Sequence, residues 1–140
     1  MKTRIVAVTA LLIMLTPAIA FSFDPQSEVK KIAEVFVKSA DSQDAELLSS
    51  VLHPKAMQYV LFGSQILIST ADEYIAQVRA KQLGGKAREI EFTEALLTGE
   101  DTAFIKIIAE GGGLIFKYHL TVFKIEGQWK IMTITTKVER

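Results

Sequence analysis

The chain has 140 residues, with sixteen basic residues balanced by sixteen acidic ones, two histidines and no cysteine. Its length is enough to bury the core of one domain. The even charge, without a basic stripe, argues against nucleic-acid binding, and the lack of cysteine excludes disulfides and thiol chemistry.

The first twenty residues have the pattern of a secretory signal peptide. Lys2 and Arg4 are followed by an apolar run from Ile5 to Leu15 and by the small-residue cleavage site Ala18-Ile19-Ala20. The apolar run is about eleven residues long, which is short of the ~20 needed to span a bilayer. The sequence therefore predicts a periplasmic or secreted protein, cleaved after Ala20, with one domain over residues 21–140 and no membrane segment. Loss of the two basic residues leaves that domain with a net charge near −2.

Helical periodicity dominates the first part of this domain. Asp24-Pro25 is a good helix start, because an aspartate N-cap precedes a proline whose missing N–H is not needed there. Apolar residues then recur at helical spacing to Ala40, which predicts an amphipathic helix. A second, shorter helix is predicted to be capped by Asp41 or Ser42 and to end before Pro54.

A short hairpin and a third helix are expected next. Residues 57–61 and 65–68 favour two strands around a glycine turn. Thr70 and Glu73 have the spacing of a capping box, in which each side chain accepts a hydrogen bond from the backbone N–H of the other residue. Gly84 is a candidate left-handed end for this third helix.

From Ala87 onward the period changes from helical to alternating. Four strands are predicted, separated by glycine-containing turns: Arg88–Leu97, Thr102–Glu110, Leu114–Ile125 and Gln128–Val138. The last two are roughly twice the usual ~5 to 6 residues, so they require a long twisted sheet that can curl around a pocket. Helices followed by such strands predict an α+β domain with three N-terminal helices packed on a long curved antiparallel sheet.

Counting back from a two-residue turn at Glu126-Gly127 divides the last two strands into two faces. The count pairs Val122 with Ile131, Leu120 with Thr133, and Tyr118 with Thr135. The face covered by the helices is the predicted ligand-binding surface, made of Phe116, Tyr118, Leu120, Ile131, Thr133 and Thr135. The opposite face is also apolar, so we expect a second subunit to bind it at His119, Thr121, Met132 and Ile134.

The order of these elements resembles the nuclear-transport-factor-2-like (NTF2-like) superfamily, a cone with a cystatin-like α+β fold. The segments DAELL…LHPKA (44–56), EYI (73–75) and YHLTVFKIEGQWKI (118–131) are similar to its "putative lumazine-binding" or SnoaL-like branch. This similarity covers nearly all of residues 21–140. It implies a concave pocket roofed by the helices and a homodimer formed through the other face of the sheet.

The sequence departs from the family pattern at the pocket. Many members of the branch have Asp-Tyr where this chain has Tyr118-His119, and ketosteroid-isomerase-like relatives use an acidic residue of this strand in their oxyanion site. An isomerase function is disfavoured here because no carboxylate is evident as a general base beside Tyr118. The tyrosine either donates a hydrogen bond to a ligand or serves as an aromatic wall.

No pattern for a metal or cofactor accompanies these strands. His53 and His119 are the only histidines, and no third ligand lies at a suitable spacing for zinc. Gly111–Gly113 separates two strands and precedes no helix, so a phosphate-binding geometry is missing. Lys106 lies in an apolar strand whose orientation the sequence leaves open, and we favour the outward side because burying an unpaired charge is costly.

Three functions are compatible with this pattern. The favoured one is a non-catalytic exported binding module, a homodimer whose cone holds a small, mostly apolar ligand. The second is an enzyme of the same fold, an isomerase or hydrolase with Tyr118 as electrophilic donor. The third is a protein-interaction module that uses an exposed sheet face or the open end of the cone.

Overall fold

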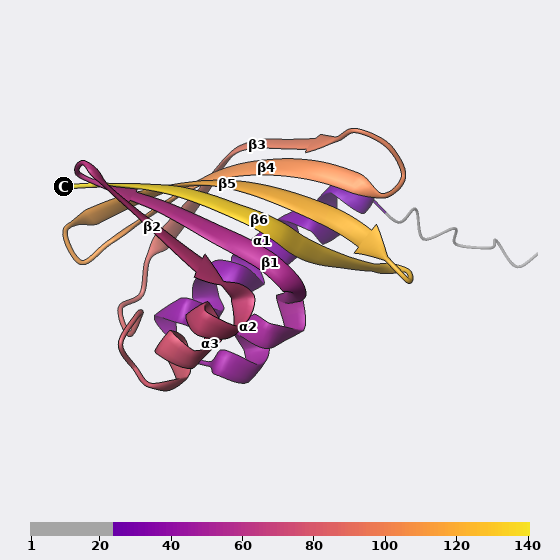
Figure 1. Ribbon diagram of the computed structural model, residues 1–140. Helices are drawn as coiled ribbons and strands as arrows, with labels where there is room; N and C mark the ends of the chain where they lie inside the picture. The colour runs from indigo at the N-terminus through magenta and orange to yellow at the C-terminus, as the bar shows by residue number, and fades with distance from the viewer. Residues whose placement is uncertain (1–23) are drawn as a thin grey trace, which may run out of the picture.

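The computed structural model describes residues 24–140 (Figure 1). The predicted signal peptide, residues 1–20, lies outside this range. Among the helices of residues 24–140, none is both long enough and apolar enough to cross a membrane.

Three helices and a single six-stranded sheet make up the domain. The helices are α1 (Pro25–Asp41), α2 (Ala45–Val51) and α3 (Ala71–Arg79), and the strands are β1 (Leu52–Phe62), β2 (Gln65–Thr70), β3 (Glu89–Leu97), β4 (Thr102–Gly111), β5 (Leu114–Ile125) and β6 (Gln128–Glu139). The strand order is β2-β1-β6-β5-β4-β3, in which β1 and β6 are parallel and the other neighbours antiparallel. The predicted α+β class is confirmed, with one parallel pair that was not expected.

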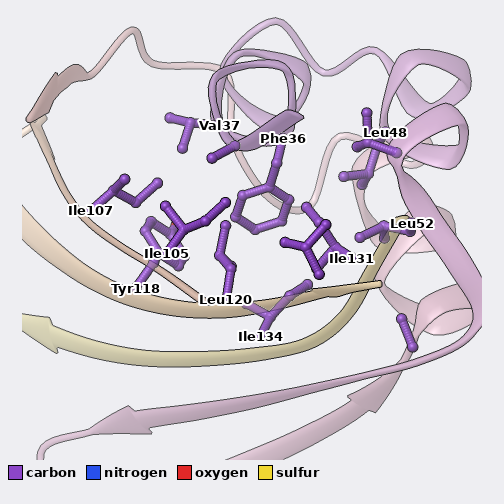
Figure 2. Close-up of a cluster of buried hydrophobic side chains, with 14 of the residues drawn as sticks. Phe36, Val37, Leu48, Leu52, Ile105, Ile107, Tyr118, Leu120, Ile131 and Ile134 are labelled. Atoms are coloured by element: carbon purple, nitrogen blue, oxygen red, sulfur yellow. The ribbon is translucent and has the colours of Figure 1, made fainter. Parts of the chain in front are cut away.

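The helices lie on one face of the sheet, and the strands curve over them (Figure 1). The core fills the space between α1 and the middle of β4, β5 and β6, where Phe36 points at Leu120 and Ile131 (Figure 2). Each large apolar side chain buried there contributes roughly 1.5–3 kcal/mol. We call the helix-covered side of the sheet the inner face and the opposite side the outer face.

Two of the predicted helix starts are confirmed. The Asp24 carboxylate accepts a hydrogen bond from the backbone N–H of Gln26 at 3.1 Å, and Pro25 opens α1. At α3 the capping box is complete, with Glu73 N–H donating to Thr70 Oγ1 at 3.2 Å and Thr70 N–H donating to Glu73 Oε2 at 2.8 Å.

The predicted start of α2 is wrong by two or three residues. Asp41 is the last residue of α1, and the backbone N–H of Ser42 donates to Lys38 O at 2.9 Å, which closes that helix. Gln43 then takes a left-handed φ of 55°, and Asp44 is the true N-cap, accepting from Leu47 N–H at 2.9 Å. Asp41, Ser42 and Asp44 are all residue types that can cap a helix. Because α1 extends through Asp41, only Asp44 is left to cap α2.

The first hairpin is longer than predicted. The helix α2 ends before Pro54 as expected, but β1 begins at once with Leu52. Pro54 lies where the pairing with β6 shifts, between Leu52 and Met57, so its missing N–H breaks no regular ladder.

A β-bulge in β6 changes the predicted register. From the turn to Val122–Ile131 the pairing is as counted, but Thr121 then faces Thr133, which leaves Met132 as an extra residue. Because side chains alternate along a strand, each residue of β6 beyond the bulge lies on the face opposite to the predicted one. Tyr118 therefore pairs with Thr136 in place of Thr135.

The loop after α3 packs tightly on the end of α1. The left-handed residue that follows α3 is Lys81 (φ 58°), so Gly84 does not end that helix as predicted. Gly84 has a φ of 80°, and a Cβ atom added there would lie 1.8 Å from the backbone oxygen of Ala40. The next residue, Gly85, donates its N–H to the same oxygen at 3.2 Å.

We expect Gly84→Ala to lower the free energy of unfolding by about 2–3 kcal/mol, since it combines a strained φ with a backbone clash. Gly63→Ala is the matched control, because Gly63 has a φ of 62° but no atom within 4 Å of the added Cβ. The control should lose only about 1 kcal/mol. Urea denaturation measures both losses, and equal losses would contradict the close packing at Gly84.

Candidate functional site

A cavity of about 790 Å³ opens at one end of the cone. Its lining includes the tips of the β1–β2 and β4–β5 hairpins and the loop after α3, segments that lie on the left of Figure 1, and we call the hairpin-tip end the mouth. This volume is within the range of ~300–1,000 Å³ typical of small-molecule sites. The apolar part of its wall is formed by Val60, Phe62, Leu67, Ile68, Leu83, Leu114, Phe116 and Val138.

Four of the six predicted ligand-binding residues lie on the inner face. Phe116 and Tyr118 line the cavity. Leu120 and Ile131 lie on the same face but are fully buried in the core beneath α1, so they support the cavity from behind (Figure 2). Their contact with a ligand stays a prediction.

The placement of Thr133 and Thr135 on the inner face is wrong. Both follow the bulge, and Thr135 lies with His119 and Thr121 in a shallow depression of the outer face. Thr136 and Val138 take their places in the cavity wall.

The predicted dimer surface is corrected by the same shift. His119 and Thr121 lie on the outer face as expected, but Ile134 is buried in the core (Figure 2). Met132 is the half-buried bulge residue. Thr133 and Thr135 belong to the outer face in place of Ile134, as does Lys106, whose Nζ lies 2.6 Å from Glu94 Oε2.

Arg88 is the charged group at the floor of the cavity. Its Nε donates to Asp41 Oδ1 at 2.6 Å, and its backbone N–H donates to Asp41 Oδ2 at 3.0 Å. Its Nη1 donates to the Tyr118 hydroxyl at 2.6 Å, and its Nη2 to Val37 O at 3.4 Å. The Arg88 and Asp41 side chains are only 9% and 10% exposed, so the pair closes the inner end of the cavity.

Aromatic rings hold this cluster in place. The guanidinium carbon of Arg88 lies 4.6 Å from the centre of the Phe116 ring, a cation–π contact. Phe36 meets the Tyr118 ring edge-on at 5.3 Å between centroids, and Phe116 stacks parallel to it at 6.1 Å. The tyrosine hydroxyl is therefore held in a fixed position.

The protonation states follow from burial and from these contacts. Burial raises the pKa of Tyr118 and outweighs the opposing effect of Arg88, so the phenol stays protonated at neutral pH. Burial also raises the pKa of the neighbouring Tyr74. Burial alone would lower the pKa of Arg88, but the Tyr118 oxygen and the Asp41 carboxylate raise it, so the guanidinium stays charged.

Thr136 adds a third polar group to this floor. It is the cross-strand neighbour of Tyr118 and lines the cavity. Its side chain is buried, and its hydroxyl has no hydrogen-bond partner within residues 24–140. A buried hydroxyl without a partner is uncommon and costs about 1–3 kcal/mol.

The arrangement is suited to binding and poorly suited to proton abstraction. Within residues 24–140, no carboxylate lines the cavity. Asp41, which lies behind Arg88, uses one oxygen for the guanidinium and the other for the Arg88 backbone N–H. Over the same residues, no three His, Cys, Asp or Glu side chains gather in a way that could hold a metal ion.

Asp41 and Arg88 are not among the predicted ligand-binding residues, although the sequence pattern around each one indicates an inward side chain. Asp41 comes four residues after the buried Val37, which places it on the inner side of α1. Arg88 alternates with Ile90 and Phe92, which pack against the core. The two periodicities indicate that both side chains point inward, and the structure brings them together.

A sequence model of the protein family described as "Putative lumazine-binding" matches residues 24–135. No protein with a curated description matches the chain.

Solved structures with low sequence identity share the fold. An NTF2-like protein of unknown function from Silicibacter pomeroyi is 18% identical, with a TM-score of 0.72, over 81% of this chain and 94% of that one. A second, from Methylobacillus flagellatus, is 17% identical, with a TM-score of 0.73, over 86% and 97%. A ketosteroid isomerase-like protein from Erwinia carotovora atroseptica is 15% identical, with a TM-score of 0.70, over 84% and 99%. At these identities the likeness is evidence for the fold alone.

We expect Thr136→Val to raise the free energy of unfolding by about 1 kcal/mol, because it removes a buried hydroxyl that has no partner and keeps the side-chain shape. Thr135→Val is the matched control one residue away, on the exposed outer face, and should change stability by less than about 0.5 kcal/mol. Thermal and urea denaturation measure both variants. A loss of stability in Thr136→Val would contradict the register beyond the bulge.

Proposed function

Since the chain belongs to the "Putative lumazine-binding" family and shares the fold of solved NTF2-like proteins, we propose that it is an exported binding protein whose cavity holds one small, mostly apolar ligand without transforming it. The observation that carries this proposal is the cavity itself. Side chains of the cone leave about 790 Å³ open, with an apolar wall and a few polar groups gathered at the floor. That combination is typical of a small-molecule site.

The hydrogen bonding of the ionisable groups supports the proposal that the protein does not transform its ligand. A proton abstraction requires a base within hydrogen-bond reach of the substrate. The acid nearest the cavity floor, Asp41, is held by Arg88 through both of its oxygens. Tyr118 is able to polarise a carbonyl, but the described residues offer it no base as a partner.

We also propose that the outer face pairs with a second copy of the chain. Leu96 and Phe104 are cross-strand neighbours there and are 50% and 46% exposed. Thr121, the neighbour of Phe104 on β5, continues this surface toward Thr133. An apolar surface of this kind, with short polar side chains beside it, favours a two-fold interface in which each copy covers the same patch of the other.

We expect wild-type protein to bind N-phenyl-1-naphthylamine, a neutral apolar dye, at one site per chain. Val60→Trp should abolish this binding, because Val60 lines the cavity and a larger ring would fill it. Leu61→Trp is the control on the same strand, since alternation turns residue 61 to the outer face, and it should bind the dye as the wild type does. Dye fluorescence measures both. Equal binding by the two variants would place the dye elsewhere and count against the proposal.

Native mass spectrometry of the protein purified from its own host tests the export and the pairing together. The expected mass is that of two chains that each begin at Phe21. Phe104→Lys should give single chains, because it places a cation at the centre of the interface. Leu47→Lys is the control, since Leu47 is an exposed apolar residue of α2, 38% accessible and remote from the outer face. A mass that includes Met1 would refute the cleavage, and dimers of the Phe104→Lys variant would refute the interface.

A further inference from the structure

We propose that the cavity floor binds the carboxylate of an amphipathic monoacid, with Arg88, Tyr118 and Thr136 as hydrogen-bond donors and the apolar body directed to the mouth. This inference rests on the proposed function, because it names the chemical class of ligand that the same cavity takes. Three observations support it: an excess of donors at the floor, the charge of the lining, and the arrangement of polar and apolar groups.

The guanidinium of Arg88 has donors left over. It carries five N–H groups, and its contacts with Asp41, Tyr118 and Val37 use three of them. The contact with Asp41 is made by Nε alone, so the carboxylate holds one end of the group and leaves the terminal nitrogens beside the cavity. Buried donors of this kind are nearly always paired in proteins, and a ligand oxygen would pair them.

Two hydroxyl groups of the cavity lining, those of Tyr118 and Thr136, also have a proton left to donate. The Tyr118 oxygen accepts from Nη1 of Arg88, so its own proton is directed elsewhere, and it finds no acceptor within residues 24–140. Thr136, its cross-strand neighbour, has a buried hydroxyl with no partner in that range. Both side chains line the same cavity, as donors to a ligand bound there must.

The charge of the lining favours a single negative charge on the ligand. Lys86 and Arg88 are the charged residues of the wall among those described, and both are cations. Asp41 offsets one of them from behind. An anion brought to this floor loses its hydration, but charge-assisted hydrogen bonds offset that loss. A cationic ligand would find no counter-charge there.

The position of the polar cluster determines the direction of the ligand. The guanidinium of Arg88 and the Tyr118 hydroxyl lie beside Asp41. Thr136 is buried, whereas Phe62 and Leu67 lie toward the tip of the β1–β2 hairpin. The side chain of Lys86 lies against Gly112 at the tip of the β4–β5 hairpin, where it attracts an entering acid. The head group therefore reaches the floor while the apolar body fills the outer part of the cavity.

The test is isothermal titration calorimetry with octanoate and octan-1-ol, which share a chain length and differ in the head group. We expect octanoate to bind wild-type protein at least about tenfold more tightly than octan-1-ol, as charge-assisted hydrogen bonds are roughly twice as strong as neutral ones. Tyr118→Phe and Thr136→Val should each weaken octanoate binding about fivefold, with a smaller effect on the alcohol. Binding of N-phenyl-1-naphthylamine is measured in both variants, and a loss of dye affinity as large as the loss of octanoate affinity would indicate collapse of the cavity and contradict the role of the hydroxyl as a donor.

The contribution of the guanidinium is tested by a paired replacement. Arg88→Met alone would leave the Asp41 carboxylate buried without its partner and endanger folding. Asp41→Leu combined with Arg88→Met removes both charges and keeps similar volume, which proteins often tolerate. This double variant should bind the dye and lose the preference for octanoate over octan-1-ol.

The following outcomes would contradict the inference. Equal binding of octanoate and octan-1-ol by the wild type, with normal dye binding, would overturn the carboxylate site and leave the proposed function intact. Loss of the preference in Lys86→Gln, with none in Tyr118→Phe, would place the acid at the mouth and overturn the floor site. Failure of the dye and of both eight-carbon compounds to bind would overturn the proposed function as well.

Discussion

The ion pair between Asp41 and Arg88 joins the last residue of α1 to the start of β3, and the inner end of the cavity depends on it. Both oxygens of the carboxylate are engaged, one by the side chain and one by the backbone of the arginine. The fixed guanidinium then orients the Tyr118 hydroxyl and lies on the Phe116 ring. A buried pair of this kind adds little net stability. Its effect here is to place a charged, hydrogen-bonding group at the point where the helix layer ends and open space begins.

That open space follows from a mismatch of lengths. At 1.5 Å per residue, the seventeen residues of α1 span about 25 Å, whereas the twelve residues of β5 or β6 span about 40 Å. The helix therefore covers only part of the inner face. Where it lies, apolar side chains fill the cone (Figure 2). Beyond Asp41 the strands continue past the end of α1, and the remaining wall is formed by Tyr74 and Gln77 of α3 and by the loop after α3, which Gly84 and Gly85 hold against Ala40.

The sequence was sufficient to predict the helices and strands, but not to predict which side chains line the cavity. Helical spacing in α1, the capping box of α3 and alternation in β3 to β6 identified each element, because local patterns determine them. The bulge at Met132 has no comparable pattern in the sequence. The segment Ile131-Met132-Thr133-Ile134 places an apolar pair before a threonine and an isoleucine, so either register buries an aliphatic side chain. With threonine at 133, 135 and 136, composition could not distinguish the two faces.

Asp41 and Arg88 were both predictable as inward residues, but their meeting depends on how far α1 extends, which its polar C-terminal residues left ambiguous.

The bulge also has a consequence for comparing this chain with its relatives. One inserted residue reverses which side of the sheet every later position of β6 faces, while leaving the hairpin and the strand intact. A homologue that lacks the insertion would align with this chain column by column and yet present the opposite set of β6 side chains to its interior. Residue identities compared across such an alignment would equate a residue of the pocket wall with one of the outer face. Positions after 132 therefore have to be matched by the face of the sheet on which they lie and not by their order in the chain.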